Sequence, residues 1–94
     1  MTRREATIGS RVGLHARPAA VFVKASAAAG VPVRIGRPDG TLVDARSMLG
    51  VLALGAKNGD TVVLESDGEG GDDALDSLVA LLEQDHDEPA PADA

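Results

Sequence analysis

The predicted fold depends first on residues 31–43, Val31-Pro32-Val33-Arg34-Ile35-Gly36-Arg37-Pro38-Asp39-Gly40-Thr41-Leu42-Val43. Apolar side chains at residues 31, 33 and 35 alternate with other residue types, as in a strand with one apolar face. Residues 37–40 are a turn signal before a short second strand, so the stretch predicts a β-hairpin. Pro32 has no N–H for a sheet ladder, so we expect it at the start of its strand or facing away from the neighbouring strand.

Two elements are predicted before this hairpin. Residues 3–9 carry Ala6 and Ile8 at period two, which indicates a first strand. Residues 16–29 are predicted to form a helix that ends at Gly30, because small and apolar side chains recur there at helical spacing. Those side chains are Ala19, Phe22, Val23 and Ser26.

Three elements are predicted after the hairpin. Residues 48–55 form a short helix with Ser47 as its N-cap, and residues 61–66 are a β-branched, apolar run typical of a central strand. A last helix begins near Asp72, with leucines and a valine at i, i+3, i+4 and i+7. The order β-α-β-β-α-β-α predicts an α+β open-faced sandwich, in which three helices cover one face of a four-stranded antiparallel sheet.

Length and composition indicate one small domain. A chain of 94 residues has room for one modest core, and without cysteine it has neither disulfides nor thiolate metal sites. We expect a domain over residues 1–85. Residues 86–94 are acidic, contain two prolines and have no apolar period, so we expect them to be a disordered tail.

Charge is divided unequally along the chain. Residues 1–50 carry eight Lys/Arg and three Asp/Glu, whereas residues 51–94 carry one Lys and twelve Asp/Glu, giving net −6. A net-acidic chain with Phe22 as its single aromatic residue is a poor candidate for nucleic-acid binding, although its basic half suits acidic protein partners. No apolar stretch approaches the roughly 20 residues of a membrane span, so a cytoplasmic protein is expected.

A histidine lies just before the first predicted helix, in Gly13-Leu14-His15-Ala16-Arg17-Pro18. A helix's first turn has unpartnered N–H groups and the positive end of the helix dipole, so a phosphoryl group on His15 would be stabilised there. Arg17 can add a charge-assisted hydrogen bond, and the φ of Pro18 is already helical. The same field is expected to keep His15 neutral and nucleophilic.

These six residues resemble the active-site signature of the HPr family, the histidine-containing phosphocarriers of the bacterial sugar phosphotransferase system. The element order is similar to that of the HPr fold over about residues 3–84. The resemblance implies a covalent carrier rather than an enzyme, with no cofactor or metal. Phospho-enzyme I, charged from phosphoenolpyruvate, would phosphorylate His15 at Nδ1, although the residues themselves do not distinguish the two ring nitrogens. IIA components of sugar transport would then receive the group.

The resemblance and the helix physics together assign roles around His15. Arg17 is expected to stabilise the charge of the transferring phosphoryl group, and the first helical turn, Ala16, Arg17 and Pro18, to bind its oxygens. A second stretch, Ser47-Met48-Leu49-Gly50-Val51, resembles the regulatory region of HPr from Gram-positive bacteria. It implies that HPr kinase/phosphorylase phosphorylates Ser47, which as a helix cap alone would contribute about 1 kcal/mol.

Family correspondence also implies a partner-docking face. Its residues are Arg17, Ala20, Lys24, Met48, Leu49 and Leu52. Adaptable apolar side chains suit a surface that meets several partners, such as enzyme I, IIA components and regulatory proteins. Val51 and Leu54 are instead expected in the core, and the chain is expected to be a monomer.

Other readings of the sequence are weaker. Asp76-Ser77-Leu78 resembles the phosphopantetheine attachment motif of acyl carrier proteins, but Ser77 lies inside an amphipathic helix. The acidic loop 67–73 lacks the spacing of a calcium loop. His86 lies between two aspartates and is expected to be a solvated residue of the tail rather than a metal ligand. The remaining alternative is a regulatory module on the same fold, including a nitrogen-branch relative; His15 and Ser47 together favour the carbon-uptake carrier.

Overall fold

The computed structural model of the 94-residue chain describes residues 2–9, 13–14 and 16–84. Its elements follow the predicted order. They are β1 (Thr2–Thr7), α1 (Ala16–Ala28), β2 (Arg34–Gly36), β3 (Val43–Asp44), α2 (Met48–Ala53), β4 (Thr61–Ser66) and α3 (Gly71–Glu83). Among the described residues no helix has the length and apolar character needed to cross a bilayer.

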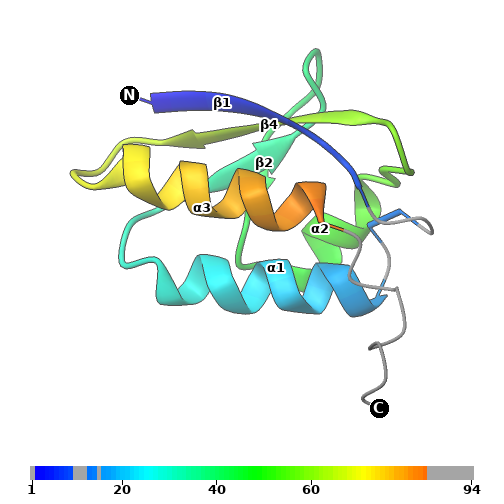
Figure 1. Cartoon of the computed structure of the whole chain (residues 1–94), viewed down its shortest axis with the longest axis horizontal. Coiled ribbons are helices and arrows are strands. Elements are labelled where there is room, and N and C mark those ends of the chain that lie inside the picture. Colours follow the sequence, from blue (N-terminus) through cyan, green and yellow to red (C-terminus); the bar gives the residue numbers. More distant parts are fainter. Residues whose placement is uncertain (1, 10–12, 15, 85–94) are drawn as a thin grey trace.

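The four strands form one antiparallel sheet in the order β1-β4-β2-β3. The apolar run 61–66 is therefore a central strand, as predicted, with β1 on one side and the β2–β3 hairpin on the other. In that hairpin Ile35 pairs with Val43, and the Gly40 N–H donates to the Arg37 carbonyl at 3.1 Å to close the turn. Figure 1 shows α1 and α3 running in opposite directions on one side of this sheet.

The core lies between the sheet and the helices. Phe22, the one aromatic residue, is fully buried at its centre on α1, and the predicted α3 stripe contributes three buried leucines. The apolar core residues are Ala6, Ile8, Leu14, Ala19, Phe22, Val33, Ile35, Ala45, Val51, Ala56, Val62, Leu64, Leu75, Leu78 and Leu82. Two alternate residues of β4, one residue each of β1 and β2, and one stripe of each long helix belong to this cluster.

The opposite face of the sheet carries a charged cluster. Glu65 on β4 lies between Arg3 on β1 and Arg34 on β2, with N–O distances of 2.7 and 3.5 Å. The Glu65 side chain is only 11% exposed, so its charge is largely desolvated and is balanced by the two guanidinium groups. These ion pairs connect three adjacent strands on the face that the helices leave uncovered.

Several predicted boundaries were wrong by one to three residues. The first strand ends at Thr7. The Ile8 N–H still donates to Asp60, the next residue in register, but the Asp60 N–H donates to Lys57 and the Gly9 N–H to Leu82, so the ladder does not continue. The hairpin's first strand begins at Arg34, so Pro32 precedes it, as the missing N–H requires. The short helix ends at Ala53, and Gly55 follows it with a φ of 62°. The boundary at residue 85 and the tail 86–94 lie outside the described residues.

Candidate phosphoryl-transfer site

The chain is fixed immediately before residue 15. The Leu14 side chain is buried, and its N–H donates to the Ala56 carbonyl at 2.8 Å. Gly13 has a φ of 82°, and a Cβ added there would lie 2.6 Å from the same Ala56 oxygen. Glycine is therefore required at this position both by backbone conformation and by the close approach to Ala56. His15 itself lies outside the described residues, but the residue before it is anchored to the loop that precedes β4.

Helix α1 begins directly after residue 15. Ala16 and Arg17 are exposed, whereas Pro18 is buried. In a 13-residue helix, the first-turn N–H groups lack intrahelical acceptors and form a ready anion site. Pro18 has no N–H to donate, so it cannot bind an oxygen; its side chain is buried, and its fixed φ suits the first helical turn. The donors available in this turn are the N–H groups of Ala16 and Arg17 and the Arg17 guanidinium.

Arg17 differs from the other described arginines. Five of them, at positions 3, 4, 34, 37 and 46, form ion pairs with Asp or Glu. Arg17 and Lys24 have no ion-pair partner among the described carboxylates, and α1 contains no acidic residue. The two side chains are therefore free to meet an anion that comes from elsewhere.

Ser47 caps α2, as the sequence predicts. Its backbone is extended, and its Oγ accepts a hydrogen bond from the Gly50 N–H at 3.1 Å. The turn before it is held by Asp44, which accepts from the Arg46 backbone N–H and pairs with the Arg46 guanidinium. That side-chain hydrogen bond lowers the pKa of Asp44. A Cβ at Gly50 would lie 3.2 Å from Ser47 Oγ, so glycine keeps space around the hydroxyl.

The residues expected in the docking face divide into two groups. Ala20, Lys24 and Leu49 are exposed, and Leu49 is 81% accessible. Met48 and Leu52 are half-buried and pack against the core, so only part of each side chain can reach a partner. Val51 is fully buried, as expected, and Leu54 is partly buried against the same core. Helices α1 and α2, which carry these residues, are in contact.

Val21 is an exposed apolar residue that the sequence argument missed. Its side chain is 37% accessible, next to Ala20 on α1. It falls outside the apolar stripe of residues 19, 22, 23 and 26. An apolar residue away from that stripe is expected to be exposed, so the sequence could have predicted this position. Val21 extends the exposed face that Arg17, Ala20 and Lys24 form.

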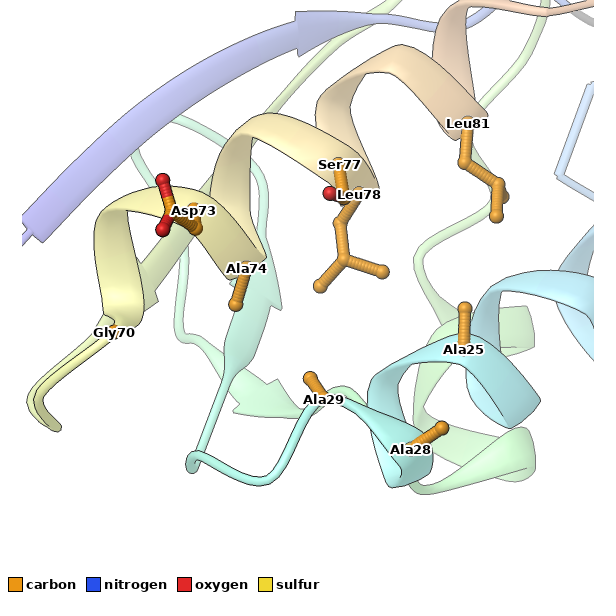
Figure 2. Close-up of a pocket in the computed structure, with 9 residues that line it drawn as sticks. All are labelled: Ala25, Ala28, Ala29, Gly70, Asp73, Ala74, Ser77, Leu78 and Leu81. Atoms are coloured by element: carbon orange, nitrogen blue, oxygen red, sulfur yellow. The ribbon is translucent and has the colours of Figure 1, made fainter.

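A cavity of about 420 Å³ lies between the C-terminal half of α1 and α3. Figure 2 shows that its walls are mainly alanine and leucine side chains of the two helices. Ser77 lies at this cavity; it is exposed and within α3, as the sequence predicts, and not at the start of a helix. Within the described part of the chain, no group of three or more His, Cys, Asp or Glu side chains could hold a metal ion.

Comparisons with known proteins agree with this geometry. Residues 2–84 match the family model "PTS HPr component phosphorylation site". The chain is 51% identical to the phosphocarrier protein HPr of Streptomyces coelicolor, over 87% of this chain and 88% of that protein. It is 42% identical to the HPr of Pseudomonas putida, over 94% and 98%. An HPr crystal structure from Bacillus anthracis superposes with a TM-score of 0.80 at 28% identity, covering 86% of this chain and 95% of that one.

These matches define a class of small phosphoryl carriers that have no catalytic activity of their own. Within that class, the chain belongs to the HPr family of the phosphotransferase system. The α+β fold and the phosphocarrier function implied by the sequence resemblance are thereby confirmed.

Proposed function

We propose that His15 is the side chain that carries the phosphoryl group in the cytoplasm, between phospho-enzyme I and the IIA components of sugar uptake. The observation that supports this most directly is the backbone on both sides of residue 15. Leu14 is anchored to Ala56, and α1 begins at Ala16. Residue 15 thus connects two fixed points of the backbone, and the helix that follows it has its positive end at Ala16.

In the proposed transfer, the lone pair of one imidazole nitrogen forms a bond to phosphorus while the bond from phosphorus to the enzyme I donor breaks. The second transfer repeats the exchange, with the IIA component as acceptor. Family analogy assigns the nitrogen as Nδ1. The Ala16 and Arg17 N–H groups and the Arg17 guanidinium balance the charge on the moving group, since such transfer depends mainly on positioning and electrostatics.

Ser47 is proposed as a regulatory phosphorylation site for an HPr kinase/phosphorylase. Its hydroxyl is half-buried and already hydrogen-bonded to the Gly50 N–H. A phosphate there would add negative charge next to the exposed Leu49 without entering the core. It would therefore weaken the binding of partners that prefer a cationic and apolar surface, while leaving the fold intact.

Arg17, Ala20, Lys24 and Leu49 are proposed as the principal docking residues, with Met48 and Leu52 contributing the exposed parts of their side chains. The first four are exposed on two contacting helices. The surface is cationic and apolar, which suits acidic partner proteins.

The test is incubation of the purified chain with enzyme I and phosphoenolpyruvate, followed by mass spectrometry at alkaline pH. We expect one acid-labile phosphoryl group, lost in His15→Ala and retained in His86→Ala, which removes the only other histidine. Ser47→Ala is expected to keep full acceptance, and Arg17→Ala to accept much more slowly while staying folded. Acceptance that survives in His15→Ala would overturn the assignment, and an unmodified chain beside a labelled control HPr would favour the regulatory module.

A further inference from the structure

One face of α1 combines positive charge with exposed small and apolar side chains. Arg17, Ala20, Val21 and Lys24 are all exposed and spaced i, i+3, i+4 and i+7, so they share one side of the helix. We call these four residues the α1 basic face. Arg17 and Lys24 are about 10 Å apart along the helix axis, from a rise of about 1.5 Å per residue.

Three described cations have no ion-pair partner among the described carboxylates: Arg17 and Lys24, which both lie on this face, and Lys57, which lies alone before β4. Arg3, Arg4, Arg34 and Arg37 lie against carboxylates that are distant in sequence, and Arg46 pairs with Asp44 two residues before it. On the α1 basic face, no described carboxylate reaches either cation. An acidic segment in the neighbourhood would therefore meet less competition on this face than on the open face of the sheet, where Glu65 and Asp67 already occupy the arginines.

The chain leaves α3 at the end of the molecule where this face begins. Figure 1 shows that α3 ends on the side where α1 starts. The last turn of α3 is held there by two contacts with the first strand region. Leu82 accepts a hydrogen bond from the Gly9 N–H at 3.0 Å, and Glu83 accepts one from the Thr7 N–H at 3.3 Å. The end of α3 is thus fixed at the end of the molecule where α1 starts.

Residues 85–94 have the charge and length to reach the α1 basic face. The segment reads Asp-His-Asp-Glu-Pro-Ala-Pro-Ala-Asp-Ala, with four carboxylate side chains and no Lys or Arg. Ten residues span up to about 33 Å when extended, which exceeds the length of the face and the roughly 8–10 Å between packed helix axes. The acidic side chains of α3, such as Asp76 and Glu83, disfavour a path back along that helix.

We propose that residues 85–94 bind the α1 basic face in the same molecule, as an intramolecular competitor for acidic partners. Asp85, Asp87, Glu88 and Asp93 would pair transiently with Arg17 and Lys24. Tethering raises the effective concentration of the segment, while each exposed pair is weak and screened by salt. A partner with a larger acidic surface displaces it. The competition rests on the proposed function of Arg17 and Lys24 in docking; the contact itself does not.

The contact is tested with a spin label, because the chain has no cysteine and Ala90→Cys creates a single thiol. Paramagnetic broadening of backbone amide signals is compared between two labelled proteins in low salt. One keeps the acidic tail; the other carries Asp85→Asn, Asp87→Asn, Glu88→Gln and Asp93→Asn. Both tails have the same length and attachment point, so any difference between them is due to charge.

We expect amides of residues 16–24 to show roughly twofold lower intensity with the acidic tail than with the neutral one. The difference is expected to vanish in high salt and in Arg17→Gln/Lys24→Gln, while Arg3 and Arg34 on the open face stay equally sharp in both proteins. Equal broadening by the two tails, or a charge-dependent effect centred on the open face, would overturn the proposal. Phosphoryl transfer is not part of the readout, so failure here is separable from failure of the carrier assignment.

Discussion

Gly13 has two constraints that can be separated by a matched substitution. Gly13 and Gly30 have nearly the same φ, 82° and 78°, but a Cβ would meet the Ala56 oxygen only at Gly13. Gly30→Ala is expected to cost about 1 kcal/mol from the left-handed backbone alone. Gly13→Ala is expected to cost roughly 2–4 kcal/mol, because the clash also displaces the hydrogen bond from Leu14 to Ala56.

Urea unfolding followed by far-ultraviolet circular dichroism measures both costs, since the chain has neither Trp nor Tyr for fluorescence. Equal losses of unfolding free energy in the two variants would mean that the loop moves at Ala56 to make room for the new methyl group. In that case Leu14 does not anchor the backbone before His15.

Ser47 has a structural role that is independent of phosphorylation. Ser47→Ala removes the hydrogen bond to the Gly50 N–H and is expected to lower the free energy of unfolding by about 1 kcal/mol. Ser47→Asp keeps a capping oxygen and is expected to stay within a few tenths of a kcal/mol of the parent. Ser77→Ala, an exposed change within α3, is the control and is expected to be neutral or slightly stabilising. A loss in Ser47→Ala no larger than in the control would contradict the cap.

The turn between α2 and β4 gives the molecule part of its acid sensitivity. The Lys57 backbone N–H and the Arg37 side chain both donate to the Asp60 carboxylate. These hydrogen bonds, with that from Lys57 having the larger effect, hold the pKa of Asp60 below the ordinary 3.8. The unfolded state therefore binds the proton more readily. This contribution to stability is fully present above pH 3.8 and is lost as pH falls through the lower, folded-state pKa.

Asp60→Asn is accordingly expected to reduce the loss of stability between pH 6 and pH 3, as measured by urea midpoints at the two pH values. Asp39→Asn is the matched control. Asp39 is an exposed aspartate in the β2–β3 turn with no hydrogen-bonded side chain among the described residues. The same pH dependence in Asp60→Asn as in the parent would show that this turn does not contribute.

Elements with strong internal patterns were predictable, whereas the end of β1, the start of β2 and the end of α2 were not. Leu75, Leu78 and Leu82 repeat at helical spacing, and residues 61–66 are apolar and β-branched, so α3 and β4 follow from local sequence. The end of β1 depends on Asp60 and Leu82, which are distant in sequence and accept the N–H groups of Ile8 and Gly9. No local pattern carries that information.

The candidate site shows the same division. Ser47 was predictable as a cap because its partner, the Gly50 N–H, is three residues away. The half-burial of Met48 and Leu52 was not, because it depends on how α2 packs against the core and α1. The burial of Pro18 likewise follows from tertiary packing rather than from the motif that contains it.

Across the whole molecule, stability and partner binding are expected to depend on different residues of the same short helix. Leu49 is 81% exposed and Val51 is fully buried, two positions apart on α2. Leu49→Ala is expected to leave the free energy of unfolding unchanged and to raise the KM for the carrier in phosphorylation by enzyme I. Val51→Ala is expected to destabilise by roughly 1–3 kcal/mol, with transfer intact while the protein is folded. Urea unfolding and steady-state kinetics on both variants check this, and a normal KM in Leu49→Ala would remove it from the docking face.

The pairing of β1 with β4 also has a consequence during synthesis of the chain. Arg3 on β1 and Glu65 on β4 pair across 62 positions in sequence, and β4 is also the strand that holds the hairpin in the sheet. Until residue 66 has emerged from the ribosome, β1 and the hairpin have no central strand on which to assemble. Pairing between distant segments slows folding, and a nascent chain of this length exposes unpaired strand edges. The sheet is therefore expected to form cooperatively, and only after β4 is available for pairing.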